Sequence, residues 1–371
     1  MANKAIKYRL YPTTEQCVMF AKTFGCCRKV WNLMLADKVK SYNETKSFGK
    51  QTPAIYKKDY PYLKEVDSLA LANVQLHLQQ AMKNCFESKH CKFPKYKSAK
   101  HSRKSYTTNN QKGTITIYDN SIKLPKVGKV KAVIHRRYED GKVKSATISQ
   151  DSAGNYYASV LYEFDMEAVT KSKNFENAIG LDYKSDGLYM DSEGNVGANH
   201  KYYQEAQEKL AKEQRKLSRR KGSKKGEEKS NNYRKQQRKV GKIHRHIVNQ
   251  RLDNLHKKST EIANRVDVVC VETLNMKAIA NKGFGNGKAT LDNGYGLFLN
   301  MLEYKLADRG KYFVRVDKWY PSSQTCNCCG SIQKIKLTER VYKCSCGYVC
   351  DRDVNAAKNI RKEGLRLLAT V

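Results

Sequence analysis

Acidic residues are scarce in this sequence relative to basic ones. Its 371 residues include 36 Asp and Glu against 71 Lys and Arg, which gives a formal net charge of +35. A chain with such an excess of one sign repels itself unless a polyanion neutralises it, and each phosphate that a basic side chain contacts also releases counterions. The imbalance therefore predicts a nucleic-acid-binding protein, with a membrane surface as the alternative.

Long apolar runs are also lacking. No segment approaches the roughly 18 apolar residues of a membrane-spanning helix. The opening "MANKAIKYRLYP" lacks the apolar core of a signal peptide. We therefore expect no membrane partner and a cytoplasmic location, where thiols stay reduced and clustered cysteines bind metal rather than form disulfides.

The pattern of apolar residues divides the chain into segments, and its length allows two or three domains. Residues 3–10 alternate like a β-strand, and residues 14–90 are mostly helical with a break near residues 41–53. Residues 112–165 form alternating stretches separated by Gly, Asn and Asp. Together with the N-terminal strand, these stretches could close a small antiparallel barrel.

The second half of the chain has an α/β pattern. The segments "NAIGLDYK" (177–184) and "VDVVCVETL" (266–274) read as buried strands. Residues 295–310 are expected to form a helix that ends at Gly310, followed by a third strand at 311–317. After the cysteine-rich segment, residues 354–368 are expected to form a last helix.

Two segments concentrate the basic charge. In residues 91–108, Lys and Arg alternate with Tyr and Phe, which suits phosphates and stacked bases, and a solvated linker is the alternative. Residues 201–260 contain 20 Lys and Arg against 6 Asp and Glu, whereas solvated helices usually mix the two signs. The candidate nucleic-acid contacts in these segments are Lys95, Tyr96, Arg215, Lys216, Arg219 and Arg220.

Six of the 12 cysteines lie between Cys326 and Cys350. Two cysteine knuckles, each followed by glycine and joined by a short hairpin, are typical of a zinc ribbon, because Zn²⁺ prefers four tetrahedral thiolates. The second knuckle is C-x-C rather than C-x-x-C, so Cys328 or Cys350 could replace one ligand. Four protein ligands leave no open position, so one structural zinc ion is expected. Its predicted ligands are Cys326, Cys329, Cys344 and Cys346.

Three acids stand out by their positions. Asp182 and Glu272 lie at or near the ends of apolar strands, where an ionised side chain is costly unless a cation meets it, and Asp353 opens the last helix. A carboxylate set without His or Cys suits Mg²⁺, and two such ions support phosphodiester hydrolysis. An Asp before a helix is more often an N-cap than a catalyst, and Asp351 could be the ligand instead of Asp353.

Several motifs, in this order, carry a resemblance to a known family: "GLD" ending at Asp182, then "VVCVETLNM", "YPSSQTCNCCG" and "CSCGYVCDRDVNAAKNI". The segments "KYRLYPTTEQ", "FGCCRKVWN", "CKFPKYKS" and "QRKLSRRKGSKKGEEK" extend the likeness over nearly the whole chain. The sequence resembles the TnpB (OrfB) RNA-guided nucleases of insertion sequences, which are related to miniature type V CRISPR effectors. The pair "SSQTCxxCG" and "DRDVNAA" is the most specific part of the match.

The resemblance implies a multi-domain α+β fold. Residues 1–10 and 100–170 would form a β-barrel wedge domain, and residues 11–99 a helical recognition domain inserted in it. Residues 175–371 would form an RNase H-like (RuvC) nuclease domain with a zinc-ribbon insert at 320–350. Residues 201–260 would line the channel for the guide–target heteroduplex, which is recognised through its backbone and A-form shape.

The resemblance also implies an activity and its residues. By motif, Asp182, Glu272 and Asp353 become the Mg²⁺ ligands, because the second Asp of "DRD" matches the family's catalytic position. The partners are a guide RNA and double-stranded target DNA. A short motif beside the target would be read from the helical insert and the barrel. Candidate readers, expected on the outside of helix 68–86, are Asn73, Gln79 and Gln80.

The sequence departs from the family pattern at Lys184, where many relatives have glycine, and at the C-x-C knuckle. Two alternative functions stay open: a compact type V CRISPR effector that uses a crRNA, and a non-cleaving RNA-guided repressor or transposition regulator. All three acids are present, which predicts an active nuclease.

Overall fold

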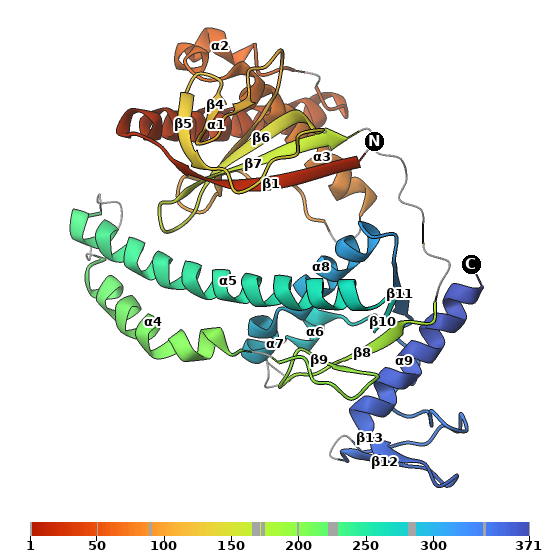
Figure 1. The fold of residues 1–371 in the computed structure, drawn as a ribbon. Coiled ribbons are helices and arrows are strands. Elements are labelled where there is room, and N and C mark those ends of the chain that lie inside the picture. The colour runs from red at the N-terminus through yellow and green to blue at the C-terminus, as the bar shows by residue number, and fades with distance from the viewer. Residues whose placement is uncertain are drawn as a thin grey trace. The chain divides into compact units, whose positions relative to one another are not determined.

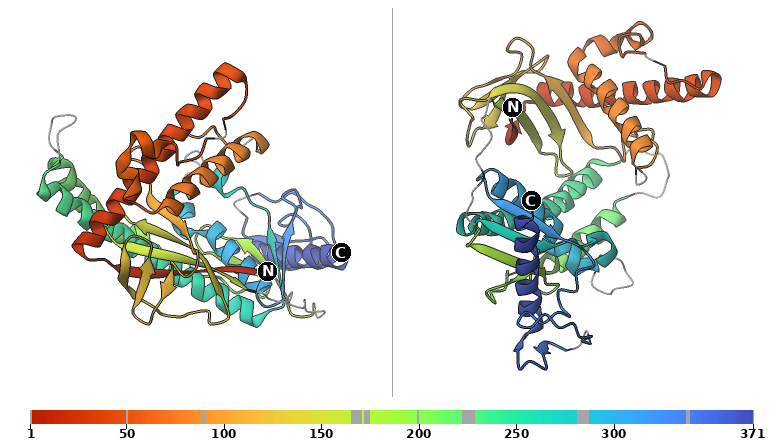
Figure 2. Two further views of the ribbon diagram at one scale, coloured as in Figure 1. Left: turned by 90° about the horizontal axis from the view of Figure 1, so that it is seen from above. Right: turned by 90° about the vertical axis from the view of Figure 1, so that its right-hand side faces the viewer.

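The computed structural model describes residues 2–49, 51–88, 91–164, 171, 175–198, 200–221, 229–280, 287–336 and 339–370. The chain divides into two compact units, Met1–Glu167 and Ala168–Val371 (Figures 1 and 2). Both helices and strands occur in each unit, so the expected α+β architecture is confirmed. Among the described helices, none is both long and apolar enough to cross a membrane.

The first unit is built on a seven-stranded antiparallel sheet with the order β2-β6-β7-β1-β5-β4-β3. The N-terminal strand lies inside this sheet, because it pairs with β7 along its length and with β5 at its end. No pairing of β2 with β3 is found among the described residues, so closure into a barrel stays a prediction. The strands are β1 (Ala2–Tyr11), β2 (Lys104–Asn109), β3 (Thr116–Ile117), β4 (Ser121–Leu124), β5 (Gly128–Val133), β6 (Lys142–Gln150) and β7 (Tyr156–Phe164).

The helices of the first unit lie between β1 and β2 in the chain. Thr13 begins the long first helix with a capping box, in which its hydroxyl accepts from Gln16 N while the Gln16 side chain accepts from Thr13 N. The apolar faces of α1 and α3 share one core with the alternate residues Ile6, Tyr8 and Leu10 of β1. The helices are α1 (Thr14–Thr45), α2 (Tyr56–Asp59), a 3₁₀ turn η1 (Pro61–Lys64) and α3 (Ser68–Glu87).

The second unit is built on a mixed four-stranded sheet with the order β11-β10-β8-β9. The two central strands are parallel to each other, with Val271 opposite Leu181, and β9 is antiparallel to β8. The expected buried strands 177–184 and 266–274 are therefore confirmed as neighbours in one sheet. The strands are β8 (Ala178–Tyr183), β9 (Tyr189–Asp191), β10 (Val268–Glu272) and β11 (Tyr312–Val316), with a separate hairpin of β12 (Val341–Lys343) and β13 (Val349–Asp351).

Helices pack on both faces of this sheet. Leu181 and Val271 belong to a core shared with α5 and α8, whereas Cys270 belongs to a core shared with Ile360 of α9. Figure 1 shows α9 and the α5–α8 pair on these two sides. The helices are α4 (Tyr202–Arg219), α5 (Asn231–Arg265), α6 (Met276–Ile279), α7 (Gly287–Asn293), α8 (Tyr295–Ala307) and α9 (Arg352–Ala369).

Glycine permits an unusually close approach of α9 to the sheet. A Cβ added at Gly180 of β8 would lie 2.0 Å from the carbonyl oxygen of Ala357, and one at Gly364 would lie 2.3 Å from the Cys270 sulfur. Neither contact can be relieved by a side-chain rotation alone, because the first is with backbone and the second also involves the Cys270 Cβ, at 2.6 Å. The two glycines therefore let the last helix pack directly against β8 and β10, the strands that carry two of the candidate acids.

Candidate functional site

Two of the three candidate acids lie on adjacent strands. Asp182 is in β8 and Glu272 is the last residue of β10, one step beyond the Val271–Leu181 pair. Because side chains alternate along a strand, and Leu181 and Val271 face the core under α5 and α8, Asp182 and Glu272 face the side of α9. Both side chains are partly buried.

The third acid comes from the start of α9. Asp351 is the N-cap of this helix, since its Oδ1 accepts from the backbone N–H groups of Asp353 at 2.8 Å and of Val354 at 3.2 Å. The capping role therefore falls on Asp351 and not on Asp353, whose side chain is 15% exposed.

The charges of the three acids act on one another. Burial raises the pKa of Asp182 well above its ordinary value, and the negative charges of Glu272 and Asp353 raise it further. Burial also raises the pKa of Glu272, while the Ser322 hydroxyl, which donates to Glu272 Oε1, opposes that shift. The charges of Glu272 and Asp353 are thus close enough to act on Asp182, but the three carboxylates do not form a ligand set as compact as that of the cysteines described below.

Two basic side chains of the protein, Lys184 and Arg352, lie beside Asp353. Lys184 Nζ lies 3.0 Å from Asp353 Oδ2, and an Arg352 nitrogen lies 3.7 Å from Asp353 Oδ1. Lys184 is also 3.9 Å from Asp186, whose side chain is 75% exposed. Burial opposes the charged form of Lys184, but the hydrogen bond and charge of Asp353 raise its pKa overall. The residue that departs from the family pattern thus contacts a candidate metal ligand.

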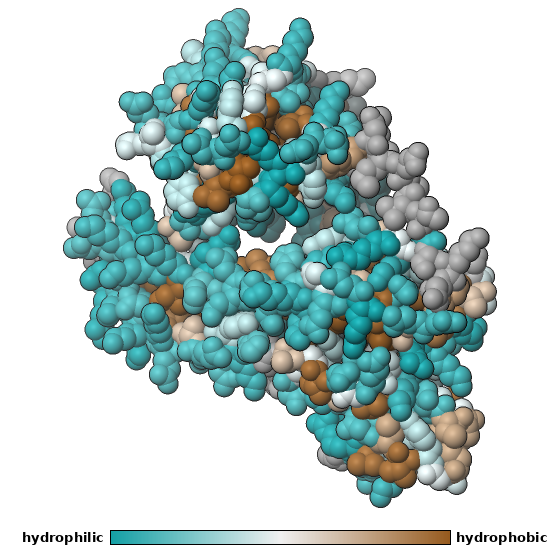
Figure 3. All heavy atoms as spheres, viewed as in Figure 1, coloured by the Kyte–Doolittle hydropathy of each residue, from teal (hydrophilic) through white to brown (hydrophobic). Residues whose placement is uncertain are grey.

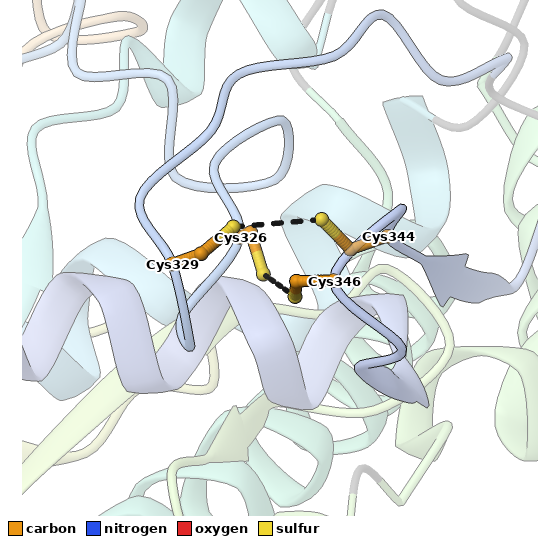
Figure 4. Close-up of side chains that lie close together, drawn as sticks. All are labelled: Cys326, Cys329, Cys344 and Cys346. Carbon is orange, nitrogen blue, oxygen red and sulfur yellow. Dashed lines mark hydrogen bonds between the residues drawn. The ribbon is translucent and has the colours of Figure 1, made fainter.

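The cysteine cluster is compact. One ligand atom from each of Cys326, Cys329, Cys344 and Cys346 lies within 4.8 Å of the others, and in the described part of the chain this is the only such set of three or more His, Cys, Asp or Glu side chains. The sulfurs of Cys326 and Cys346 are 3.7 Å apart, and those of Cys329 and Cys344 are 3.6 Å apart (Figure 4). The expected ligand set is therefore brought together, and it fits one structural zinc ion.

The C-x-C knuckle contributes both of its cysteines, Cys344 and Cys346, to the cluster, and Cys328 and Cys350 lie outside it. Gly330 and Gly347, with φ of 79° and 86°, turn the two knuckles. The Cys346 backbone N–H lowers the pKa of the Cys344 thiol, whereas at Cys346 the Tyr348 backbone N–H lowers the pKa but the Cys344 thiol and burial raise it overall. Cys328 is exposed outside the set, and Cys350 lies in β13 opposite Tyr342. Neither of these two cysteines replaces a ligand.

Two buried asparagines connect the cysteine cluster to the acids. Asn359 Nδ2 donates to the carbonyls of Ser322 at 2.8 Å and Thr325 at 2.6 Å, and Asn355 Nδ2 donates to Thr325 at 2.8 Å. Both asparagines are on α9, two and six residues after Asp353, and the segment that they hold, from Ser322 to Thr325, leads into Cys326. Sequence reasoning missed these residues and Ser322, although asparagines four apart on an otherwise apolar helix face were a visible signal.

The expected nucleic-acid contacts differ in their exposure. Gln79 and Gln80 are exposed on α3 as expected, but the placement of Asn73 on the outside is wrong. Asn73 is buried with Ala70, Leu71 and Val74, and its Nδ2 donates to the Leu69 carbonyl at 2.9 Å. It lies on the same helix face as its apolar neighbours, so packing and not polarity decided its position. Lys95 and Tyr96 are both exposed.

The basic pair of helices α4 and α5 is held by a buried glutamine. Gln236 of α5 donates to the carboxylate and to the carbonyl of Glu213 on α4, at 2.6 and 3.0 Å. This bond, with that of Lys216, lowers the pKa of Glu213 to about 2. Arg220 also bonds Gln236. Arg215 and Arg219 are exposed, and no ion pair or side-chain hydrogen bond links them to another described residue.

Comparison with known proteins identifies relatives over the whole chain. Three family models match: a "Cas12f1-like, TNB domain" at residues 295–360, a "Helix-turn-helix domain" of OrfB of IS605 at residues 1–47, and the OrfB of IS605 model described as "Probable transposase" at residues 159–282. In this chain the second match covers β1 and the single helix α1.

Two relatives share the name "Putative RNA-guided DNA endonuclease". One, from Streptomyces pristinaespiralis, is 35% identical over 98% of this chain and 89% of its own length. The other, InsQ of Escherichia coli K12, is 29% identical over 99% of this chain and 93% of its own length. A solved structure, titled as a Cas12f1–sgRNA–target DNA complex, matches 97% of this chain and 98% of its own with a TM-score of 0.59 at 12% identity. The last likeness concerns the fold alone.

Proposed function

Because the chain belongs to the TnpB (OrfB) family, we propose that it is an RNA-guided DNA endonuclease that hydrolyses phosphodiester bonds at Asp182, Glu272 and Asp353. The observation that carries the proposal is the electrostatic coupling of these three acids, which come from β8, β10 and α9. Asp351 is the N-cap of α9, so Asp353 is left for the chemistry.

The donor set fits Mg²⁺. Carboxylate oxygens are its preferred protein ligands, and no His or Cys belongs to the three-acid set. The raised pKa of Asp182 reflects its burial first and the negative charges of Glu272 and Asp353 second, and a divalent cation bound there would offset both. These three side chains would hold two Mg²⁺ ions. In such sites, the ions would activate a water molecule and stabilise the leaving oxygen. Meanwhile the Ser322 hydroxyl orients Glu272, and Lys184 and Arg352 hold Asp353.

The finer domain assignment is part of the same proposal. Residues 175–371 form an RNase H-like (RuvC) nuclease domain with a zinc-ribbon insert at 320–350, and residues 1–10 with 100–170 form a wedge barrel that carries the helical recognition domain 11–99. The mixed sheet with acids on its two central strands supports the first assignment. The incorporation of β1 between β7 and β5 supports the second, because it joins the N-terminus to the later strands.

Guide RNA and double-stranded target DNA are the proposed partners. The relatives are named for RNA-guided action on DNA, and the net charge of +35 requires a polyanion for neutralisation. Hydrophilic residues cover most of the visible face of α4 and α5 (Figure 3), and their exposed basic side chains supply phosphate contacts for the guide–target heteroduplex. Sequence recognition would then come from base pairing, with a short duplex motif read by the protein.

The test combines RNA sequencing with cleavage assays. The RNA that co-purifies with the chain is sequenced, and a matching target plasmid is offered to the complex with Mg²⁺. Asp182→Ala, Glu272→Ala and Asp353→Ala should abolish cutting and retain guide-dependent binding, whereas Asp351→Asn, which keeps a capping side chain, should still cut. Cutting by Asp353→Ala would transfer the role to Asp351. Guide-dependent binding without cutting in the unaltered protein would assign a repressor function in place of the nuclease.

A further inference from the structure

Trp319 is an exposed aromatic side chain that the three-acid site does not use. The chain has two tryptophans, and they differ sharply: Trp31 is buried in the first unit, whereas Trp319 is 79% exposed. Among the large apolar and aromatic side chains described, it is one of the most exposed. Single exposed apolar residues are common and require no explanation by themselves. The surroundings of this one set it apart.

The backbone around Trp319 is fixed on both sides. Asp317 Oδ1 accepts from the Trp319 N–H at 2.8 Å, and the Asp317 carbonyl accepts from Tyr320 N at 3.1 Å. Tyr320 packs against the core under α9, and its carbonyl accepts from Ser322 N at 2.8 Å. The indole ring therefore projects from a tight turn whose neighbours are held, which lowers the entropy lost when a ligand contacts it.

The turn lies at the edge of the sheet where the acids are. It follows β11 directly, and the last residue of β11, Val316, pairs with Glu272. Three residues beyond Trp319, the Ser322 hydroxyl donates to Glu272. A chain segment of only four residues, from Trp319 to Ser322, thus joins the exposed ring to the side chain that orients a candidate ligand of the metal.

The ring also carries a cation. Lys318 Nζ lies 4.6 Å from the centroid of the Trp319 ring. This ammonium group can cover one face of the indole only, and the high exposure of the side chain leaves ring surface available. A flat aromatic surface beside a lysine matches a nucleotide, whose base stacks on the ring while its phosphate meets the ammonium group.

We propose that Trp319 is a stacking platform for an unpaired nucleobase of the strand that reaches the three-acid site, with Lys318 contacting its phosphate. The inference rests on the proposed nuclease function, which places a nucleic-acid strand at this edge of the sheet. A single strand is favoured over a duplex, because bases inside a duplex are already stacked and do not present a face to a protein ring.

The test uses tryptophan emission of the full chain, purified with whatever RNA accompanies it and studied without added Mg²⁺. An oligo(dT) of about 12 nucleotides should quench the emission, and a blunt DNA duplex of equal length should not. The Trp319→Phe variant retains only the Trp31 signal, so its titration is subtracted as the background. Oligo(U) is the arm that distinguishes RNA from DNA as the source of the base.

Affinity supplies the second readout. Trp319→Ala should weaken oligo(dT) binding by roughly 5- to 150-fold, the range for loss of one stacked base, while Trp319→Phe should keep most of the affinity. Tyr304→Ala on α8, another exposed aromatic of the same unit, is the matched control and should bind as the unaltered protein does. Melting temperatures of all variants exclude unfolding as the cause.

Because cleavage is not measured, a failure of the nuclease proposal leaves this test intact. Unchanged Trp319 emission at saturating oligo(dT), or equal affinity of Trp319→Ala, would overturn the inference. An emission change that follows protein concentration and ignores the oligonucleotide would assign the ring to a contact between copies of the chain, and would overturn it as well.

Discussion

Lys184 holds Asp353 by an ion pair, and we expect it to compete with the metal for that carboxylate. Replacing Lys184 by methionine tests this expectation. Methionine keeps most of the side-chain length and removes the charge. The two charged atoms are 3.0 Å apart, and the side chains are 21% and 15% exposed, so the pair is neither fully buried nor a surface pair. In the proposed site, Mg²⁺ binding requires Asp353 to give up or share this partner.

The magnitude follows from the geometry. Two unit charges about 4 Å apart attract by about 4 kcal/mol at an effective dielectric constant of about 20. Partial desolvation of both groups and the ordering of the lysine side chain offset much of this attraction, which leaves about 1–2 kcal/mol. Without added Mg²⁺, Lys184→Met should therefore melt about 2–8 °C lower, given about 2–4 °C per kcal/mol for a unit of this size.

The metal response should move in the opposite direction. With its competitor removed, Asp353 should bind Mg²⁺ or Mn²⁺ about 5- to 30-fold more tightly, the factor that corresponds to 1–2 kcal/mol. Isothermal titration and the rise of melting temperature with metal concentration measure it. Chelators are avoided here, since they would also remove zinc.

Two control variants define the outcome. Asp186→Asn removes the exposed second partner of Lys184, 3.9 Å away, and should change metal affinity and melting temperature little. Lys184→Arg keeps the positive charge and should therefore show neither the tighter metal binding nor the lower melting temperature of Lys184→Met. Unchanged or weaker metal binding by Lys184→Met would refute the competition argument. In that case Lys184 would act with the metal and not against it.

Three further predictions concern the rest of the second unit. Cys344→Ser should lower the zinc content from one ion per chain to none and lower the melting temperature, whereas Cys328→Ser, outside the cluster, should retain zinc; equal loss in both would contradict the ligand set. Burial lowers the pKa of Lys305 to about 8, so the folded state binds fewer protons than the unfolded state between about pH 8 and 10.5. The free energy of unfolding of the unaltered protein, relative to that of Lys305→Met, should therefore rise with pH across that window, and a fall would contradict the lowered pKa of Lys305. Arg215→Ala and Arg219→Ala together should reduce the salt slope of heteroduplex binding by about 1 per lost phosphate contact, measured as log Kd against log salt, with an unchanged slope as the contrary result.

Local patterns in the sequence were sufficient to predict the main strands and the cysteine ligands of the second unit. Short continuous apolar runs before Asp182 and Glu272 predicted buried strands, because a central strand of a sheet covered by helices on both faces buries its side chains on both sides. The cysteine spacing likewise predicted a four-ligand zinc ribbon, since knuckles place their sulfurs through short-range turns, although it left Cys328 or Cys350 open as a substitute for one ligand. In each case the signal lies within a few residues of the feature that it determines.

Contacts between residues that are far apart in the sequence follow from the fold. Lys184 and Asp353 are 169 positions apart in the sequence, and the hydrogen bonds of Asn355 and Asn359 to the segment before Cys326 span 30 to 37 positions. Asn73 was misplaced for a different reason: its polarity predicted exposure, whereas the helical spacing already visible in the sequence puts it on the same face as Ala70 and Val74. Polar side chains carry no periodic signal of their partners, so their roles follow from the fold and not from the sequence.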